Sequence, residues 1–230
     1  QALEKAGSRP QDVDLIILGT DSPDYTTPAT SVVLQHKLGA KNAGTFDVGC
    51  ACASFPTGAA IASGLIASNP ALETVLVVGV YNMHKLASPD DPMVFFYGDG
   101  AGAAVVERAA ARSRRRILSS YLSSDGNLSK LLYIPAGGSN LEVTPERYAQ
   151  NLHKMHMSGR ELFKVAVRTL TECALRTLEK LHMPAIRLDW FVPHQANLRI
   201  IEAVANRIGI PMEKVVINLD RYGNTSAATI

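Results

Sequence analysis

The chain has 230 residues, of which 47% are hydrophobic and 19% are charged, with a formal net charge of +2. A nearly neutral chain of this length is expected to bury a large core, and its charge does not favour nucleic-acid binding. Apolar stretches such as residues 75–80 are too short to span a bilayer, and no charged-then-apolar leader is evident. Three cysteines are too few for a disulfide framework. We therefore expect a cytoplasmic protein in a reducing compartment, without a membrane partner.

Apolar, β-branched runs alternate with helical patterns through the first half of the chain. The predicted elements are strands at 15–19, 45–48 and 74–80, and helices at 31–38 and 52–67. The second helix consists mostly of small residues, which suits a helix pressed between two sheets, and Pro56 falls in its first turn, where a missing N–H is tolerated. Repeated strand–helix–strand units predict an α/β fold with parallel strands covered on both faces.

The second half of the chain repeats this order of elements from near residue 117. The predicted elements are strands at 117–124, 189–192 and 215–217, helices at 159–181 and 196–208, and a long surface loop at 132–154. We therefore predict two similar halves, an N-terminal one at residues 1–112 and a C-terminal one at residues 113–230.

Three short segments each place a reactive side chain where a strand-like run meets a helix-like run. Cys52 would stand at the start of a helix, whose positive end stabilises a thiolate and lowers the thiol pKa. His194 follows Pro193 at the end of a strand, where α/β folds place functional side chains. Asn224 lies in a turn signal, Tyr-Gly-Asn-Thr-Ser. Together they indicate one site in which a thiol attacks a carbonyl and two polar groups manage charge on oxygen.

Each of these residues also has a purely structural interpretation. Cys52 alone can be a small core residue, as we expect of Cys50 and Cys173, and Asn224 alone can serve only its turn. Papain-like proteases also combine Cys, His and Asn, but this chain lacks their Cys-Gly-Ser-Cys-Trp type motif. The glycines at 98–102 precede a strand, which favours close backbone approach over a phosphate site. The histidines lack metal-ligand spacing, so we expect no metal and no permanently bound cofactor.

Long segments of the sequence resemble one family. Residues 47–55, 98–106, 157–166, 189–199 and 218–227 resemble the β-ketoacyl-acyl-carrier-protein synthase III family of thiolase-superfamily condensing enzymes. The resemblance covers essentially the whole chain. It implies a thiolase-like layered α-β-α-β-α sandwich of two similar halves, assembled as a homodimer. It also implies that roughly sixty family residues before Gln1 and roughly forty after Ile230 lie outside this sequence, and that the chain without them is not a competent enzyme.

The resemblance implies a decarboxylative Claisen condensation of acyl-CoA with malonyl-acyl-carrier protein, which initiates fatty acid or related polyketide synthesis. Cys52, in the N-terminal half, would take the acyl group from acyl-CoA. His194 and Asn224, in the C-terminal half, would hydrogen-bond the malonyl thioester oxygen while CO₂ leaves. An Asn in place of a second His favours the priming, CoA-using type. Two alternatives stay open: a thioester acyltransferase on the same fold that does not condense, and a catalytically silent scaffold or dimerisation partner.

The resemblance also assigns binding residues. Thr27 matches a position that reaches the acyl pocket of the partner subunit. The acyl-CoA-binding residues would be Met157, Arg160, Phe163, Ala166, Asn197 and Arg199, and the carrier-protein surface would consist of Lys164, Arg199 and Arg207. Two departures bear on how CoA is held: Asp91 stands where some relatives have an Arg that stacks on the adenine, and Arg160 stands where some have Asn.

Overall fold

The computed structural model describes residues 1–110 and 112–230, and it divides into two compact units. The first unit consists of Gln1–Tyr81, Gly100–Ser120 and Thr225–Ile230, and the second of Asn82–Asp99 and Tyr121–Asn224. Each unit draws on separate stretches of the chain. The division into two similar halves at residues 112 and 113 stays a prediction.

The first unit is built on a four-stranded sheet with the strand order β2-β1-β3-β4. Strand β1 (Leu15–Gly19) pairs in parallel with both β2 (Gly44–Val48) and β3 (Thr74–Asn82), and β4 (Asp99–Glu107) forms an edge. Every residue of β1 is buried, as expected of an apolar strand inside a parallel sheet. The predicted α/β arrangement with parallel strands is confirmed.

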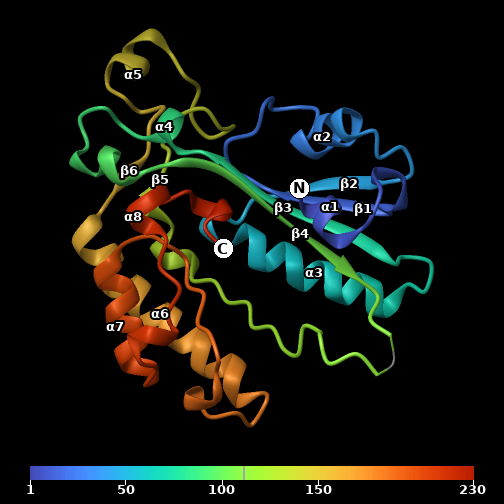
Figure 1. The fold of residues 1–230 in the computed structure, drawn as a ribbon. Helices are drawn as coiled ribbons and strands as arrows, with labels where there is room; N and C mark the ends of the chain where they lie inside the picture. The colour runs from blue at the N-terminus through green and yellow to red at the C-terminus, as the bar shows by residue number, and fades with distance from the viewer. Residues whose placement is uncertain (111) are drawn as a thin grey trace. The chain divides into compact units, whose positions relative to one another are not determined.

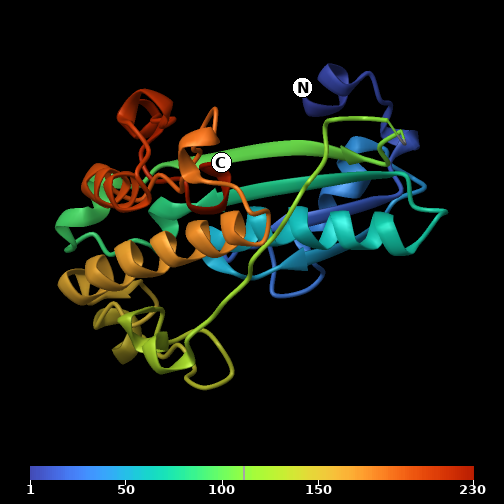
Figure 2. The ribbon, with the colours of Figure 1, turned by 90° about the horizontal axis from the view of Figure 1, so that it is seen from below.

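Helices cover both faces of this sheet (Figure 1). On one face α3 (Ser54–Ser68) packs against Ile17 and Val77, and Gly58 permits the close approach, since a Cβ there would lie 3.1 Å from the Val77 side chain. On the opposite face α1 (Ala2–Ala6) and α2 (Thr30–Leu38) contribute Leu3 and Leu34 to a second cluster. Figure 2 shows α3 lying along the strands. The small residues predicted for this helix therefore serve its packing on the sheet.

The segment Ala51–Ser68, which includes α3, is long and apolar enough to cross a membrane by length and composition alone, and within residues 1–110 and 112–230 it is the one such segment. Inspection of the sequence missed it, because single Ser, Thr and Gly residues interrupt its apolar runs. Its buried residues Gly58, Ala62 and Ile66 lie on one side of α3, with Ala62 and Ile66 in the cluster that packs on the sheet. Within the described residues, 22% of this segment is buried.

The second unit is centred on two helices that pack side by side, α6 (Gly159–Glu179) and α7 (Leu198–Ile208), as both views show. Their core includes Val167, Ile201 and Val204. The unit also holds the short helices α4 (Met83–Leu86), α5 (Pro145–Ala149) and α8 (Leu219–Tyr222), and the strands β5 (Leu132–Tyr133) and β6 (His156–Met157). The 3₁₀ turns of the two units are η1 (Pro10–Asp12), η2 (Ala51–Ala53), η3 (Pro92–Phe96), η4 (Gly126–Leu131), η5 (Ala185–Arg187), η6 (Met212–Lys214) and η7 (Ser226–Ala228).

The strands predicted in the second half are wrong for the described chain. Residues 117–124 have no regular structure, and 189–192 and 215–217 share only one bridge, between Phe191 and Val215. A strand needs a neighbour to satisfy its N–H and C=O groups, and Leu118 and Leu122 are 62% and 59% exposed. The predicted loop at 132–154 is also wrong in part, because it contains β5 and α5.

Gly79 in β3 has a steric role that can be tested. A Cβ at this position would lie 2.2 Å from the backbone oxygen of Ala227 in η7. We expect Gly79→Ala to lower the free energy of unfolding by about 1–3 kcal/mol, because backbone atoms must move to admit the methyl group. Denaturant unfolding measures the loss. Gly64→Ala in α3 is the control, since no heavy atom lies within 4 Å of its Cβ position. Equal midpoints for wild type and Gly79→Ala would contradict the packing described.

Candidate active site

Cys52 lies in η2, the tight turn that joins β2 to α3. Ala51 adopts a left-handed conformation with φ of 47°. Ser54 closes the turn, because its Oγ donates to the Ala51 carbonyl at 2.7 Å and accepts from the Cys50 N–H at 2.9 Å. Within the first unit, Ser226 Oγ donates to Cys52 Sγ at 3.4 Å. The cysteine therefore precedes the first turn of α3, and its sulfur has a hydroxyl partner.

The surroundings of Cys52 oppose its ionisation. Burial raises the pKa of the Cys52 thiol, the hydrogen bond from Ser226 lowers it, and the negative charge of Asp21 raises it. The net shift is upward, which reverses the direction predicted from the helix terminus. Desolvation of the thiol therefore outweighs the stabilisation of a thiolate by the positive end of the helix. The expectation that Cys50 is a core residue is also wrong, since Cys50 is exposed, whereas Cys173 in α6 is partly buried.

His194 lies in the second unit, in the loop that leads to α7. The loop is fixed by the fully buried Gln195, whose amide nitrogen donates to the carbonyls of Pro193 at 2.9 Å and Val216 at 3.0 Å. The Gln195 oxygen accepts from the Asn218 N–H at 3.0 Å. Burial lowers the pKa of His194 to about 4. The imidazole is therefore neutral near pH 7, when it offers one N–H donor and one nitrogen acceptor.

Asn224 is held by backbone pairing in the second unit. Its N–H donates to the Phe96 carbonyl at 2.7 Å, and its carbonyl accepts from the Gly98 N–H at 3.0 Å, in a parallel bridge with Tyr97. The preceding Gly223 has φ of 66°, and a Cβ there would lie 2.8 Å from the Phe96 oxygen. The Asn224 side chain is buried. The turn predicted from Tyr-Gly-Asn-Thr-Ser is thus anchored to a neighbouring segment, which a plain surface turn would not be.

The structure places the other candidate residues on three elements of the second unit and one loop of the first. Thr27 is exposed in the loop before α2. Arg160, Phe163, Lys164 and Ala166 lie on α6, Arg199 and Arg207 lie on α7, Met157 lies on β6, and Asn197 precedes α7. The Asn197 side chain accepts from the Arg199 N–H at 2.9 Å, so it caps α7. This structural role for Asn197 was not foreseen from the sequence.

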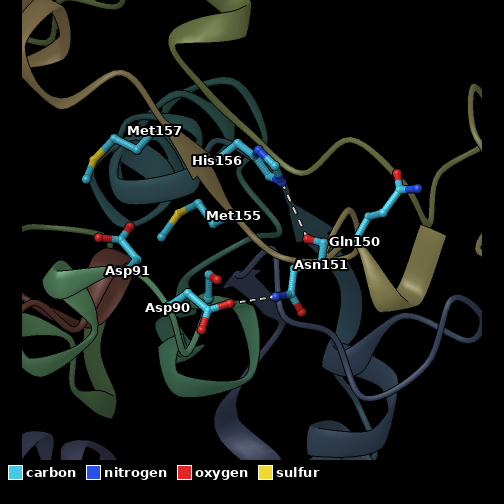
Figure 3. A pocket seen from close by; sticks show the side chains of 8 residues that line it. Asp90, Asp91, Gln150, Asn151, Met155, His156 and Met157 are labelled. Carbon is cyan, nitrogen blue, oxygen red and sulfur yellow. Dashed lines mark hydrogen bonds between the residues drawn. The ribbon is translucent and has the colours of Figure 1, made fainter. Parts of the chain in front are cut away.

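One hollow of the second unit brings two candidate CoA-binding positions together. Its volume is about 320 Å³, and its lining consists of Ser88, Asp90, Asp91, Gln150, Asn151, Met155, His156 and Met157 (Figure 3). Asn151 joins two sides of it, since its amide donates to Asp90 at 2.9 Å and its carbonyl lies 3.4 Å from His156 Nε2. Asp91 caps η3 through the Met93 N–H. Arg160 is not among the lining residues. No motif marks Asn151 in the sequence, and the spacing of His153 and His156 favours a surface or packing role.

Fold and candidate residues define a class of protein: a thiolase-like α/β protein with a cysteine at a strand–helix junction, a half-buried histidine and a buried asparagine. The family described as 3-oxoacyl-[acyl-carrier-protein (ACP)] synthase III matches residues 46–126, and the model of its C-terminal part matches residues 178–230. The chain belongs to the 3-oxoacyl-[acyl-carrier-protein] synthase III family of condensing acyltransferases.

Individual relatives agree with this membership. The β-ketoacyl-[acyl-carrier-protein] synthase III of Caldanaerobacter subterraneus subsp. tengcongensis is 42% identical over 231 residues, which cover 100% of this chain and 69% of the relative. The crystal structure of the synthase III from Aquifex aeolicus VF5 is 38% identical, with a TM-score of 0.89, over 100% of this chain and 69% of that one. The structure from Pseudomonas aeruginosa PAO1 is 34% identical, with a TM-score of 0.89, over 100% and 68%. The predicted family and fold class are confirmed.

Proposed function

We propose that this chain carries the decarboxylative condensation of acyl-CoA with malonyl-acyl-carrier protein, with Cys52 as nucleophile and His194 and Asn224 as hydrogen-bond donors. The contact between Ser226 Oγ and Cys52 Sγ at 3.4 Å carries the proposal. Only Thr225 separates Ser226 from Asn224 in the sequence, so covalent geometry keeps the two Cα atoms within about 7.6 Å. Asn224 is thus tied through the chain to the residue that contacts the reactive sulfur.

The first half-reaction forms a thioester on Cys52. The thiolate attacks the carbonyl carbon of acyl-CoA, the C–S bond to CoA breaks, and CoA leaves as a thiolate that takes up a proton. Burial raises the pKa of the Cys52 thiol, so only a small fraction is thiolate near pH 7. The rate of acylation is therefore set by how the thiolate is formed and held.

The second half-reaction needs donors that carry no charge. When the malonyl group loses CO₂, the electron pair of the broken C–C bond moves onto the thioester oxygen as an enolate. Asn224 and neutral His194 can each donate an N–H to that oxygen. An imidazolium would also pair with the malonyl carboxylate and stabilise the ground state, which opposes decarboxylation. The enolate carbon then attacks the Cys52 thioester and releases the thiolate.

The experiment that tests this function is mass spectrometry in two steps, on protein of the relatives' full length. Acyl-CoA should add one acyl mass to the peptide that contains Cys52. Malonyl-carrier protein should then remove that mass, release CO₂ and yield a β-ketoacyl-carrier protein. Deacylation by an oxygen or nitrogen acceptor without CO₂ would identify a non-condensing acyltransferase. Absence of any adduct would identify a silent scaffold and contradict the proposal.

We further propose a cytoplasmic homodimer that meets the carrier protein through a basic surface. Lys164 on α6 and Arg199 and Arg207 on α7 are all exposed, and an acidic partner would be attracted to them. Substrate contacts would come from Met157, Arg160, Phe163, Ala166, Asn197 and Arg199. No permanently bound cofactor takes part in the proposed reaction.

Thr27 is proposed to limit primer length from the partner subunit. We expect Thr27→Phe to shorten the longest acyl-CoA that is accepted, because the larger side chain fills the acyl pocket of the mate. Acylation rates with a series of acyl-CoA chain lengths measure the change. Thr26→Phe is the matched control, since Thr26 is an exposed neighbour in the same loop. An unchanged chain-length profile for Thr27→Phe would show that Thr27 does not line the pocket.

A further inference from the structure

Ser226 contacts Cys52 and is tightly packed. It begins η7, has φ of 52° and is 1% exposed. Two glycines of the sheet make space for the turn. A Cβ on Gly79 of β3 would lie 2.2 Å from the Ala227 oxygen, and one on Gly100 of β4 would lie 3.0 Å from Thr225 Cγ2. The contact of Ser226 Oγ with Cys52 Sγ therefore follows from the backbone, which fixes where this hydroxyl can be.

A second hydroxyl, that of Tyr81, also interacts with Ser226. Tyr81 ends the buried part of β3, is 5% exposed, and hydrogen-bonds with both Ser226 and Asp21. Asp21 comes from the loop after β1, where a Cβ on Gly49 would lie 3.1 Å from its Oδ1. The side chains of Asp21, Tyr81, Ser226 and Cys52 therefore form one row of contacts within the first unit, and none of these contacts is used by the reaction described above.

The hydrogen bonds among these side chains have a defined direction. Burial and then the Asp21 carboxylate raise the pKa of Tyr81, so the phenol stays protonated and donates to Asp21. The Tyr81 oxygen is then free to accept from Ser226. The Ser226 hydroxyl donates to the Cys52 sulfur at 3.4 Å, and the Tyr81 oxygen is a second acceptor for the same proton. A thiolate is the stronger acceptor, because hydrogen bonds to an ionised group are roughly twice as strong as neutral ones.

We propose that Ser226 is a positioning residue that donates its hydroxyl proton to the Cys52 thiolate, and that Tyr81 and Asp21 help to orient this hydroxyl. The Ser226 proton turns to Tyr81 when the sulfur is acylated and its negative charge has gone. The inference rests on the proposed role of Cys52 as nucleophile. The hydrogen bond from Ser226 offsets part of the rise in the Cys52 thiol pKa that burial causes.

Asp21 acts in the opposite sense to Ser226. Its negative charge disfavours a thiolate on Cys52, and it also interacts with Tyr81. Removal of the charge in Asp21→Asn should therefore lower the pKa of the Cys52 thiol, whereas removal of the hydroxyl in Ser226→Ala should raise it. The two substitutions are therefore expected to shift the pKa of the Cys52 thiol in opposite directions. A general loss of structure would not produce opposite shifts.

The test is the pH profile of iodoacetamide alkylation at Cys52, read on the Cys52 peptide so that Cys50 and Cys173 do not contribute. We expect Ser226→Ala and Ser226→Gly each to raise the apparent thiol pKa by about one unit and to slow alkylation near pH 7 about tenfold. Serine and alanine both carry a Cβ, so Ser226→Ala removes the hydroxyl without adding strain at φ of 52°, whereas Ser226→Gly also relieves that strain. A shift shared by both variants therefore reports loss of the hydroxyl. Ser31→Ala is the matched control, because Ser31 is fully buried and its Oγ has no hydrogen-bond partner.

The outcomes separate this inference from the proposed function. Unchanged profiles in both Ser226 variants, or a shift in Ser226→Ala alone, would overturn the inference, as would an upward shift in Asp21→Asn. Acyl-CoA labelling of the same samples tests the function independently. If Cys52 alkylates with the expected shifts but takes up no acyl group, the role of Ser226 stands and the role of Cys52 as acyl acceptor fails.

Discussion

Cys52→Ser is expected to reduce acylation by acyl-CoA at least about 10³-fold, the scale that follows loss of a nucleophile. A serine hydroxyl ionises far less readily than a thiol, and the site already opposes ionisation by burial. The side chain is nearly isosteric, so the fold should be retained. Mass spectrometry of the Cys52 peptide after incubation with acyl-CoA measures the effect, with circular dichroism as the check on folding.

The other cysteines supply the controls. Cys50 is exposed and lies two residues from Cys52, and Cys173 lies on α6 in the second unit. Cys50→Ser and Cys173→Ser should each acylate at the rate of the wild type. Because Cys50 is the more accessible thiol, it is the serious competitor for the role of nucleophile. An acyl adduct on Cys50 that persists in Cys52→Ser would reassign the site.

The elements that the sequence predicts well are those whose pattern is local. Residues 15–19 form a strand because every side chain is apolar, and the helix after Cys52 is evident from its run of small residues. Residues 117–124 and 189–192 also contain apolar and aromatic side chains that favour strands, but they form no strand. A strand exists only with a partner, and that partner is set by contacts between distant parts of the chain, which a local pattern does not contain.

The residues of the candidate site also differ in whether a local sequence pattern marks them. Cys52, His194 and Asn224 stand out because each follows a recognisable junction or turn. Ser226 lies in the same short motif as Asn224, but its positive φ and its contact with Cys52 are evident only in the structure. Asp21 and Tyr81 carry no local signal, since only tertiary packing brings the end of β3 and the loop after β1 to the sulfur. The direction of the Cys52 pKa shift was predicted wrongly for the same reason, because burial is a property of the fold.

Asn224→Ala and His194→Ala are expected to separate the two half-reactions. Acylation requires the thiolate and a polarised carbonyl, so Asn224→Ala should still acylate with a modest loss. Decarboxylation requires both donors on the developing enolate, and loss of one such donor reduces the rate by about 10²–10³. Each variant should therefore take up acyl groups on Cys52 and release little CO₂ from malonyl-carrier protein. The measurement pairs the Cys52 adduct with ¹⁴CO₂ release.

Two surface residues provide matched controls for these variants. Asn206 on α7 and His36 on α2 are exposed, so Asn206→Ala and His36→Ala should leave both half-reactions unchanged. Measuring the two half-reactions separately also tests whether His194 acts as an enolate donor or as the base for Cys52. If His194→Ala lost acylation and kept decarboxylation, the imidazole would have to be the base that takes the proton from Cys52. With its pKa lowered to about 4, His194 would then be a weak base, which would hold the thiol proton only while acylation consumes the thiolate. Asn224 would be the only enolate donor of the pair.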